Sequence, residues 1–118
     1  MIKPLVSARG PKLEPVVRVT RYTVSCLPEA EIDRSSWDLI VEERGPDSWA
    51  VLSGSYCLGR RGKLVYEPSP SRRSDAFKKA YRFPLEEALK IARTYAPTIV
   101  RNGMKPADVL ALRAARGD

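Results

Sequence analysis

Eight basic side chains gathered between positions 58 and 82 have the clearest capacity for chemistry. This segment holds only two acidic side chains, so its net charge is +6. Guanidinium groups bind phosphate through paired hydrogen bonds, and ammonium groups bind it as point charges. We therefore expect the segment to follow the phosphate backbone of a nucleic acid. The predicted nucleic-acid-binding residues are Arg60, Arg61, Lys63, Arg72, Arg73, Lys78, Lys79 and Arg82.

Three aromatic residues, Tyr66, Phe77 and Tyr81, interleave with these charges. Aromatic faces beside cations suit stacking with single-stranded bases. Two alternatives stay open: the charges form an ordinary solvated surface with the aromatics in the core, or they contact an acidic protein. DNA is favoured over RNA as the partner.

An enzyme, a metal site and a cofactor are not expected. The chain contains no histidine, which removes the commonest general base and the commonest zinc ligand. Its two cysteines, Cys26 and Cys57, cannot close a tetrahedral zinc site and are expected to be free thiols. The serines lack a nearby Ser-x-x-Lys arrangement, and lysines in an exposed basic loop keep their protons. We predict a non-catalytic protein.

The acidic segment 29–47 supplies a second hypothesis of function. It carries seven acidic and two basic side chains, a net of −5. Glu29, Glu31 and Asp33 alternate, but the spacing does not match an EF-hand loop. Acidic and basic patches on one chain would suit a protein-interaction or virion structural component, and they would allow homo-oligomers.

Length and composition place the chain among ordinary globular proteins. It has 118 residues, of which 43% are hydrophobic and 30% charged, with a formal net charge of +7. No apolar run is long enough to cross a bilayer, and the first residues lack the apolar core of a signal peptide. The expected location is therefore the cytoplasm, or the host cytoplasm if the protein is phage-encoded.

Two parts are predicted: a flexible N-terminal arm over residues 1–14 and a single domain over residues 15–118. The arm shows no hydrophobic period and contains Pro4, Gly10 and Pro11. The domain opens with β-branched residues from Val16, which predict a strand that buries Tyr22, Val24 and Cys26.

Turn residues organise the next strands. Residues 37–52 predict a hairpin, since two alternating segments flank the turn residues 45–48. Residues 53–55 predict a bulge, because glycine inside a strand often marks one, and the strand resumes over 56–58. Residues 59–62 predict a tight turn that carries Arg60 and Arg61 at its tip, before a strand over 63–67.

One amphipathic helix is predicted over residues 84–95. Leu85, Ala88, Leu89 and Ala92 form its apolar stripe, and Glu86 and Glu87 lie in its first turn. A helical turn is expected over 75–80, a turn at 102–103 and a short last helix over 106–116. The predicted fold class is α+β: an antiparallel sheet of about four strands, one main amphipathic helix packed on it and a short C-terminal helix.

Twelve residues between positions 49 and 97 resemble short, uncharacterised proteins of actinobacteria and their phages. The similarity spans roughly residues 20–112 and implies a small phage-type accessory protein without an assigned activity. The matching residues are Trp49, Val51, Gly62, Tyr66, Glu67, Pro68, Phe83, Ala88, Leu89, Ala92, Ala96 and Pro97.

The order of a tryptophan strand, a basic turn, a strand, a loop, Phe83 and a Glu-Ala helix is also similar to the arm-type, AP2-like modules of phage integrases. In that family the sheet enters a DNA groove. The resemblance implies that Arg60, Arg61 and Lys63 would contact DNA. The long loop before Phe83 and the strand before Trp37 depart from the family's pattern.

Overall fold

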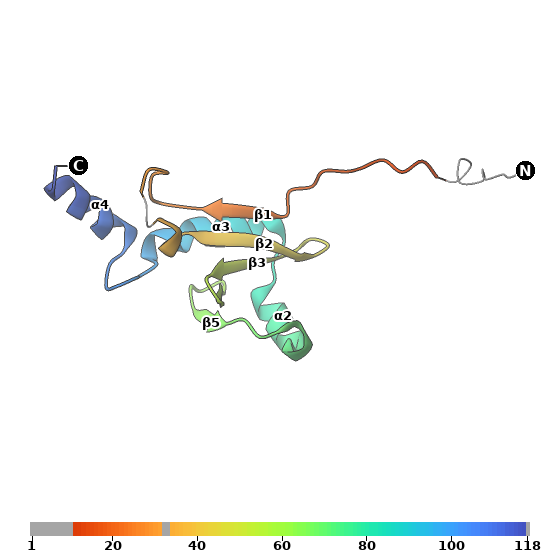
Figure 1. Ribbon diagram of the computed structural model, residues 1–118. Helices are drawn as coiled ribbons and strands as arrows, with labels where there is room; N and C mark the ends of the chain where they lie inside the picture. Colours follow the sequence, from red (N-terminus) through yellow and green to blue (C-terminus); the bar gives the residue numbers. More distant parts are fainter. Residues whose placement is uncertain (1–10, 32–33, 118) are drawn as a thin grey trace, which may run out of the picture.

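A computed structural model describes residues 11–31 and 34–117 and shows an α+β fold (Figure 1). Five strands form one antiparallel sheet in the order β1-β2-β3-β4-β5, so each strand pairs with the next along the chain. The strands are β1 (Arg21–Val24), β2 (Leu39–Gly45), β3 (Ser48–Ser53), β4 (Tyr56–Leu58) and β5 (Leu64–Tyr66). The predicted fold class is confirmed, with five strands in place of about four.

The predicted hairpin is formed by β2 and β3, with Val41 opposite Val51. Proline fixes its own φ in the connecting turn, and Asp47 takes the left-handed value of 47°. The first strand of the hairpin begins at Leu39, two residues later than predicted. Trp37 is nevertheless buried and donates a hydrogen bond from Nε1 to the carbonyl oxygen of Met104, at 2.9 Å.

The bulge predicted at residues 53–55 is wrong. These residues form a tight turn, and the chain reverses so that Leu52 lies opposite Cys57 and Ser53 opposite Tyr56. Gly54 adopts φ 59° there. A glycine with positive φ suits a bulge and a hairpin turn equally well, so the local pattern could not separate them.

The first strand is shorter than predicted. Only Arg21–Val24 pair with β2, because β2 ends at its own hairpin turn soon after Glu43, whose amide donates to the carbonyl oxygen of Thr20. Residues 11–20 continue as an exposed extended chain. Cys26 lies beyond the strand and is exposed, which corrects its predicted burial. Residues 1–10 of the predicted arm lie outside the described residues, and the two-part division stays a prediction.

The main core lies between one face of the sheet and α3 (Leu85–Tyr95). Figure 1 shows this helix running over β1, β2 and β3. Its buried residues are Ala88, Ile91 and Ala92, whereas Leu85 and Leu89 of the predicted stripe are half-buried. The predicted helix is confirmed, and Ile91 is an additional core residue.

A smaller cluster covers the opposite face. Ala50, Leu52 and Cys57 are buried there beneath Phe77 and Tyr81 of α2 (Asp75–Tyr81). The hydroxyl of Ser74 caps α2 by accepting a 3.0 Å hydrogen bond from the amide of Phe77. The helical turn expected here is confirmed. As a result, β3 is buried on both of its faces.

The C-terminal helix α4 (Pro106–Ala115) is also confirmed. It follows a turn in which Asn102 and Gly103 have positive φ, between the paired residues Arg101 and Met104. Val109 is buried, whereas Leu110 and Leu112 are 40% and 45% exposed. The remaining short helices are η1 (Arg34–Ser36), η2 (Pro70–Arg72) and η3 (Ala96–Thr98). None of the described helices is both long and apolar enough to span a membrane.

Candidate nucleic-acid interface

The structure divides the eight predicted cations between two places. Arg60, Arg61 and Lys63 belong to the turn between β4 and β5, and the other five lie on η2, on α2 or directly after them. The turn is closed by hydrogen bonds from Gly59 N to the Lys63 carbonyl and from Gly62 N to the Gly59 carbonyl, both 3.0 Å. The predicted turn is confirmed, and its side chains Arg61 and Lys63 are exposed.

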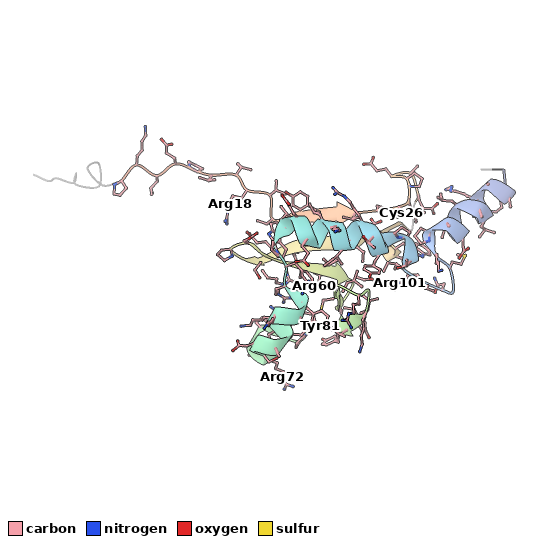
Figure 2. The ribbon with its side chains drawn as sticks, turned by 180° about the vertical axis from the view of Figure 1, so that it is seen from behind. Arg18, Cys26, Arg60, Arg72, Tyr81 and Arg101 are labelled. Atoms are coloured by element: carbon pink, nitrogen blue, oxygen red, sulfur yellow. The ribbon has the colours of Figure 1, made fainter. Side chains whose placement is uncertain are left out.

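Arg60 is held against α3. Its Nε and Nη2 donate to the carboxylate of Glu87 at 2.5 and 3.1 Å, and its guanidinium carbon lies 4.8 Å from the centre of the Phe83 ring. The hydrogen bond from Arg60 lowers the pKa of Glu87. Arg60, which is labelled in Figure 2, therefore already has an anionic partner within the chain.

The turn itself is also fixed to α3. The hydroxyl of Tyr95 donates to the carbonyl oxygen of Arg60 at 3.2 Å. Gly62 has φ 86°, and a Cβ built on it would lie 2.5 Å from the Tyr95 ring. Only glycine suits this position, so the basic tip has a defined location relative to the helix.

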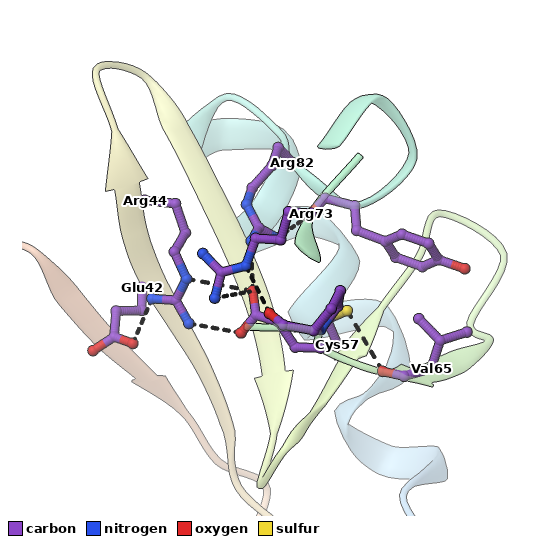
Figure 3. Close-up of polar contacts among 9 residues, drawn as sticks. Glu42, Arg44, Cys57, Val65, Arg73 and Arg82 are labelled. Atoms are coloured by element: carbon purple, nitrogen blue, oxygen red, sulfur yellow. Dashed lines mark hydrogen bonds and ion pairs between the residues drawn. The ribbon is translucent and has the colours of Figure 1, made fainter. Parts of the chain in front are cut away.

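Three arginines converge on the carboxylate of Glu67, directly after β5 (Figure 3). Arg44 of β2 donates from Nη2 at 2.9 Å, and Arg82, directly after α2, donates from Nη2 at 2.5 Å. Arg73 forms a longer ion pair of 3.7 Å. Arg44 also binds Glu42 at 2.7 Å. We call Glu42, Arg44, Glu67, Arg73 and Arg82 the Glu67 cluster.

Four of the five side chains in the Glu67 cluster are largely buried, and that of Glu42 is 35% exposed. The side chains of Glu67 and Arg82 are 10% and 8% exposed, and those of Arg44 and Arg73 are 20% and 18% exposed. Burial alone raises the pKa of Glu67, but hydrogen bonds and charge from Arg44 and Arg82 outweigh it and hold that pKa below its ordinary value. Burial lowers the pKa of Arg82, although a guanidinium remains charged.

The cluster joins parts of the chain that are distant in sequence. It links β2 to the segment after β5 and to both ends of the α2 region. The Nε of Arg73 also donates to the Pro68 carbonyl at 2.8 Å, and Arg82 lies over the Phe77 ring at 5.3 Å. Two of the eight predicted binding residues, Arg73 and Arg82, therefore contribute to the fold.

Arg60, Arg73 and Arg82 are thus bound within the chain. The remaining five of the eight predicted cations are exposed, and within the described residues none of these five forms an ion pair. We call this set the exposed cations. Figure 2 shows Arg72 at the outer end of α2. The exposed cations are Arg61, Lys63, Arg72, Lys78 and Lys79.

A surface pocket of about 500 Å³ lies between two of the exposed cations and the Glu67 cluster. Lys78 and Lys79 line it together with the three arginines Arg44, Arg73 and Arg82. Its charge and shape suit a phosphate or a carboxylate. Arg44 was not predicted as a binding residue because it lies in the acidic segment 29–47. The available signal was its position two residues after Glu42, since residues two apart on a strand share one face and can form an ion pair.

The three aromatics do not share one environment. Phe77 and Tyr81 stack with ring centres 5.1 Å apart and pack into the smaller core. Tyr66 is 65% exposed and contacts Tyr56 edge to face at 6.0 Å. The exposed aromatic pair is thus Tyr56 and Tyr66, of which only Tyr66 was predicted from the sequence.

The acidic segment has its own partners. Glu31 pairs with Arg113 of α4 at 3.0 Å, and Glu42 pairs with Arg44. Among the described residues no group of three or more His, Cys, Asp or Glu side chains could hold a metal ion, and Asp33 lies outside them. Both cysteines are free thiols, and burial raises the pKa of the Cys57 thiol.

Comparison with protein-family models gave no match, and comparison with the curated proteins and with the solved structures gave none either. The candidate interface therefore rests on the geometry of this chain.

Proposed function

We propose that the chain is a non-catalytic accessory protein that binds nucleic acid through its exposed cations. The observation that carries this proposal is the division of charge within residues 58–82. Glu67 within the segment is bound by Arg44, Arg73 and Arg82, and Glu87 beyond it is bound by Arg60, whereas Asp75 in the first turn of α2 forms no ion pair within the described residues. The exposed cations have no such partner within the described residues, so they are available to an external anion.

The position of these cations supports a phosphate backbone as that anion. They project from a hairpin tip and from a short helix at one end of the sheet, and the pocket beside Lys78 and Lys79 can receive a phosphate. Non-sequence-specific contacts of this kind supply much of the affinity of nucleic-acid-binding proteins. The proposal favours DNA over RNA, a phage-type role and a cytoplasmic location.

The test is fluorescence anisotropy with duplex DNA, single-stranded DNA and RNA over a salt series. The test variant is Lys78→Ala with Lys79→Ala, and the matched control is Lys90→Ala with Arg93→Ala, which removes two exposed charges from α3. We expect the test variant to flatten the log–log salt slope by about two units, one per lost phosphate contact, and the control to leave it unchanged.

Equal effects of the two double variants would show that only the overall net charge matters. A polyglutamate competitor separates phosphate from carboxylate binding. Binding of polyglutamate as tight as that of DNA would favour the second candidate, a protein-interaction or virion component. The observation behind that candidate is the same cationic pocket, since it can accept a carboxylate from an acidic protein.

A further inference from the structure

Residues 11–20 leave the sheet as an exposed extended chain in line with β1 (Figure 1). Val16, Val17 and Val19 are 78%, 96% and 59% exposed. β-branched residues at this density favour strands, yet within the described residues positions 11–19 form no backbone–backbone hydrogen bond. This segment has the composition of a strand and lacks a partner.

The strand that follows the segment also lacks a partner on one side. β1 is at an end of the sheet and pairs only with β2 among the described strands. The carbonyl of Thr20 faces β2, where it accepts from Glu43 N at 2.9 Å. Backbone groups alternate in direction along an antiparallel strand, so Arg21 and Thr23 direct theirs away from the sheet.

The opposite end of the sheet offers less to an incoming strand. β5 has three residues, and Pro68 and Pro70 follow it closely. Short edge strands and prolines limit pairing with another chain. The unpaired edge that can be extended is therefore the one formed by β1 and the residues before it.

We propose that two copies of this chain pair antiparallel along β1, with residues 16–19 of each copy beside Arg21–Val24 of the other. The two-fold axis passes through Thr20 of both copies. Val19 then lies opposite Arg21 and Val17 opposite Thr23, and these are the residues whose backbone groups face the new edge. The pairing joins the two sheets into one.

The neighbouring registers are unfavourable. An axis through Val19 would place Pro15 opposite Thr23, and proline has no N–H to donate to the outward carbonyl there. An axis through Arg21 would place two guanidinium groups directly opposite each other. The axis through Thr20 avoids both problems and pairs threonine with threonine, which is a favourable cross-strand pair.

Side chains also match in the proposed register. Tyr22 and Val24 are half-buried at the rim of the main core. Val16 of the second copy would cover Val24, and the long side chain of Arg18, labelled in Figure 2, would lie beside the Tyr22 ring. Both contacts remove apolar surface from water, and both come from residues that are exposed in one copy alone.

The first test uses a substitution that affects one edge of the extended segment. Val19→Pro removes an N–H that faces the second copy, whereas the matched control Leu13→Pro places a proline at an exposed position outside the paired residues and leaves the contacts of Val16 and Arg18 in place. Sedimentation equilibrium over a concentration series should show a dimer for the unmodified chain and for the control. Val19→Pro should weaken dimerisation by about tenfold or more, because two symmetric hydrogen bonds are lost.

The second test fixes the register in a Cys26→Ser background, which leaves Cys57 buried. Thr20→Cys should form a disulfide between copies with diamide, because residues at a non-hydrogen-bonded antiparallel pair have Cα atoms about 4.5 Å apart. Arg18→Cys should not, since it lies opposite Tyr22. A chain that stays monomeric, equal effects of the two prolines, or equal cross-linking of the two cysteines would overturn the proposal.

Discussion

The Glu67 cluster and the exposed cations take most of their members from the same basic segment, yet they differ in nearly every physical respect. The side chain of Arg82 is 8% exposed and its guanidinium binds a carboxylate. Lys78 and Lys79, only four and three residues earlier on α2, are exposed. The ion pairs of the cluster link β2 to the residue after β5 and to the α2 region, whereas the exposed cations form no ion pair within the described residues. A count of positive charges along a sequence therefore overstates the charge available to a ligand.

The largest effect is expected for Glu67→Gln, which keeps the shape of the side chain and removes its charge. Three arginines would then share a largely buried site without their central anion. We expect the free energy of unfolding to fall by about 3 kcal/mol, measured by urea denaturation, because removing one partner leaves buried charge uncompensated.

Two variants serve as controls for that measurement. Glu86→Gln changes an exposed carboxylate on α3, and Lys78→Ala with Lys79→Ala changes the exposed cations. Both should leave the free energy of unfolding within about 0.5 kcal/mol of its original value. A loss as large as that of Glu67→Gln in either control would remove the distinction between the two groups.

Acid should weaken the Glu67 cluster selectively. The pKa of Glu67 is lower in the folded chain than its ordinary value of about 4.3, so the folded state binds fewer protons than the unfolded state near that pH. The stabilisation of the folded state by the ionised carboxylate of Glu67 is present above about pH 4.3 and is lost as the pH falls through the lower pKa of the folded chain. Urea denaturation at several pH values should therefore show the original chain and Glu67→Gln converging in acid. A constant difference in free energy would contradict this assignment.

The smallest effect is expected at the hairpin tip, where the ion pair of Arg60 and Glu87 is open to solvent. Glu87→Gln should lower the thermal midpoint slightly at low salt, and the difference should vanish at high salt, because exposed ion pairs are screened. The effect of Glu67→Gln should persist at high salt. If the effect of Glu87→Gln persisted at high salt, the ion pair of Arg60 and Glu87 would be no more screened by solvent than the Glu67 cluster.

The elements that could be predicted from sequence are those with local signals. The main helix was marked by Pro84, by acidic residues in its first turn and by a regular apolar stripe. The β2–β3 hairpin and the tip between β4 and β5 were marked by turn residues between alternating segments. In each case the deciding interactions lie within a few residues of one another.

What could not be predicted depends on contacts between distant residues. Glu67 meets Arg44 and Arg82 only after the sheet and α2 have formed, so the sequence could not separate binding cations from structural ones. The start of β1 was set by where β2 turns and its end by where β2 begins at Leu39, so Cys26 lies beyond the paired residues and is exposed. Gly54 was ambiguous because one backbone conformation serves both a bulge and a reversal.

Phe83 has a consequence for how this protein can change over time. β4 is short, and beyond it Phe83 occupies the edge of β3 by exchanging two backbone hydrogen bonds with Trp49, of 2.8 and 3.0 Å. These bonds need no particular side chain, and they fix the point at which the chain enters α3. Changes of charge at the exposed positions between residues 69 and 81 can accumulate without moving the main core, whereas Arg73, Phe77 and Tyr81 remain tied to the sheet by their contacts. The exposed cations of η2 and α2 thus lie on a segment whose exposed positions can vary while the main core keeps its place.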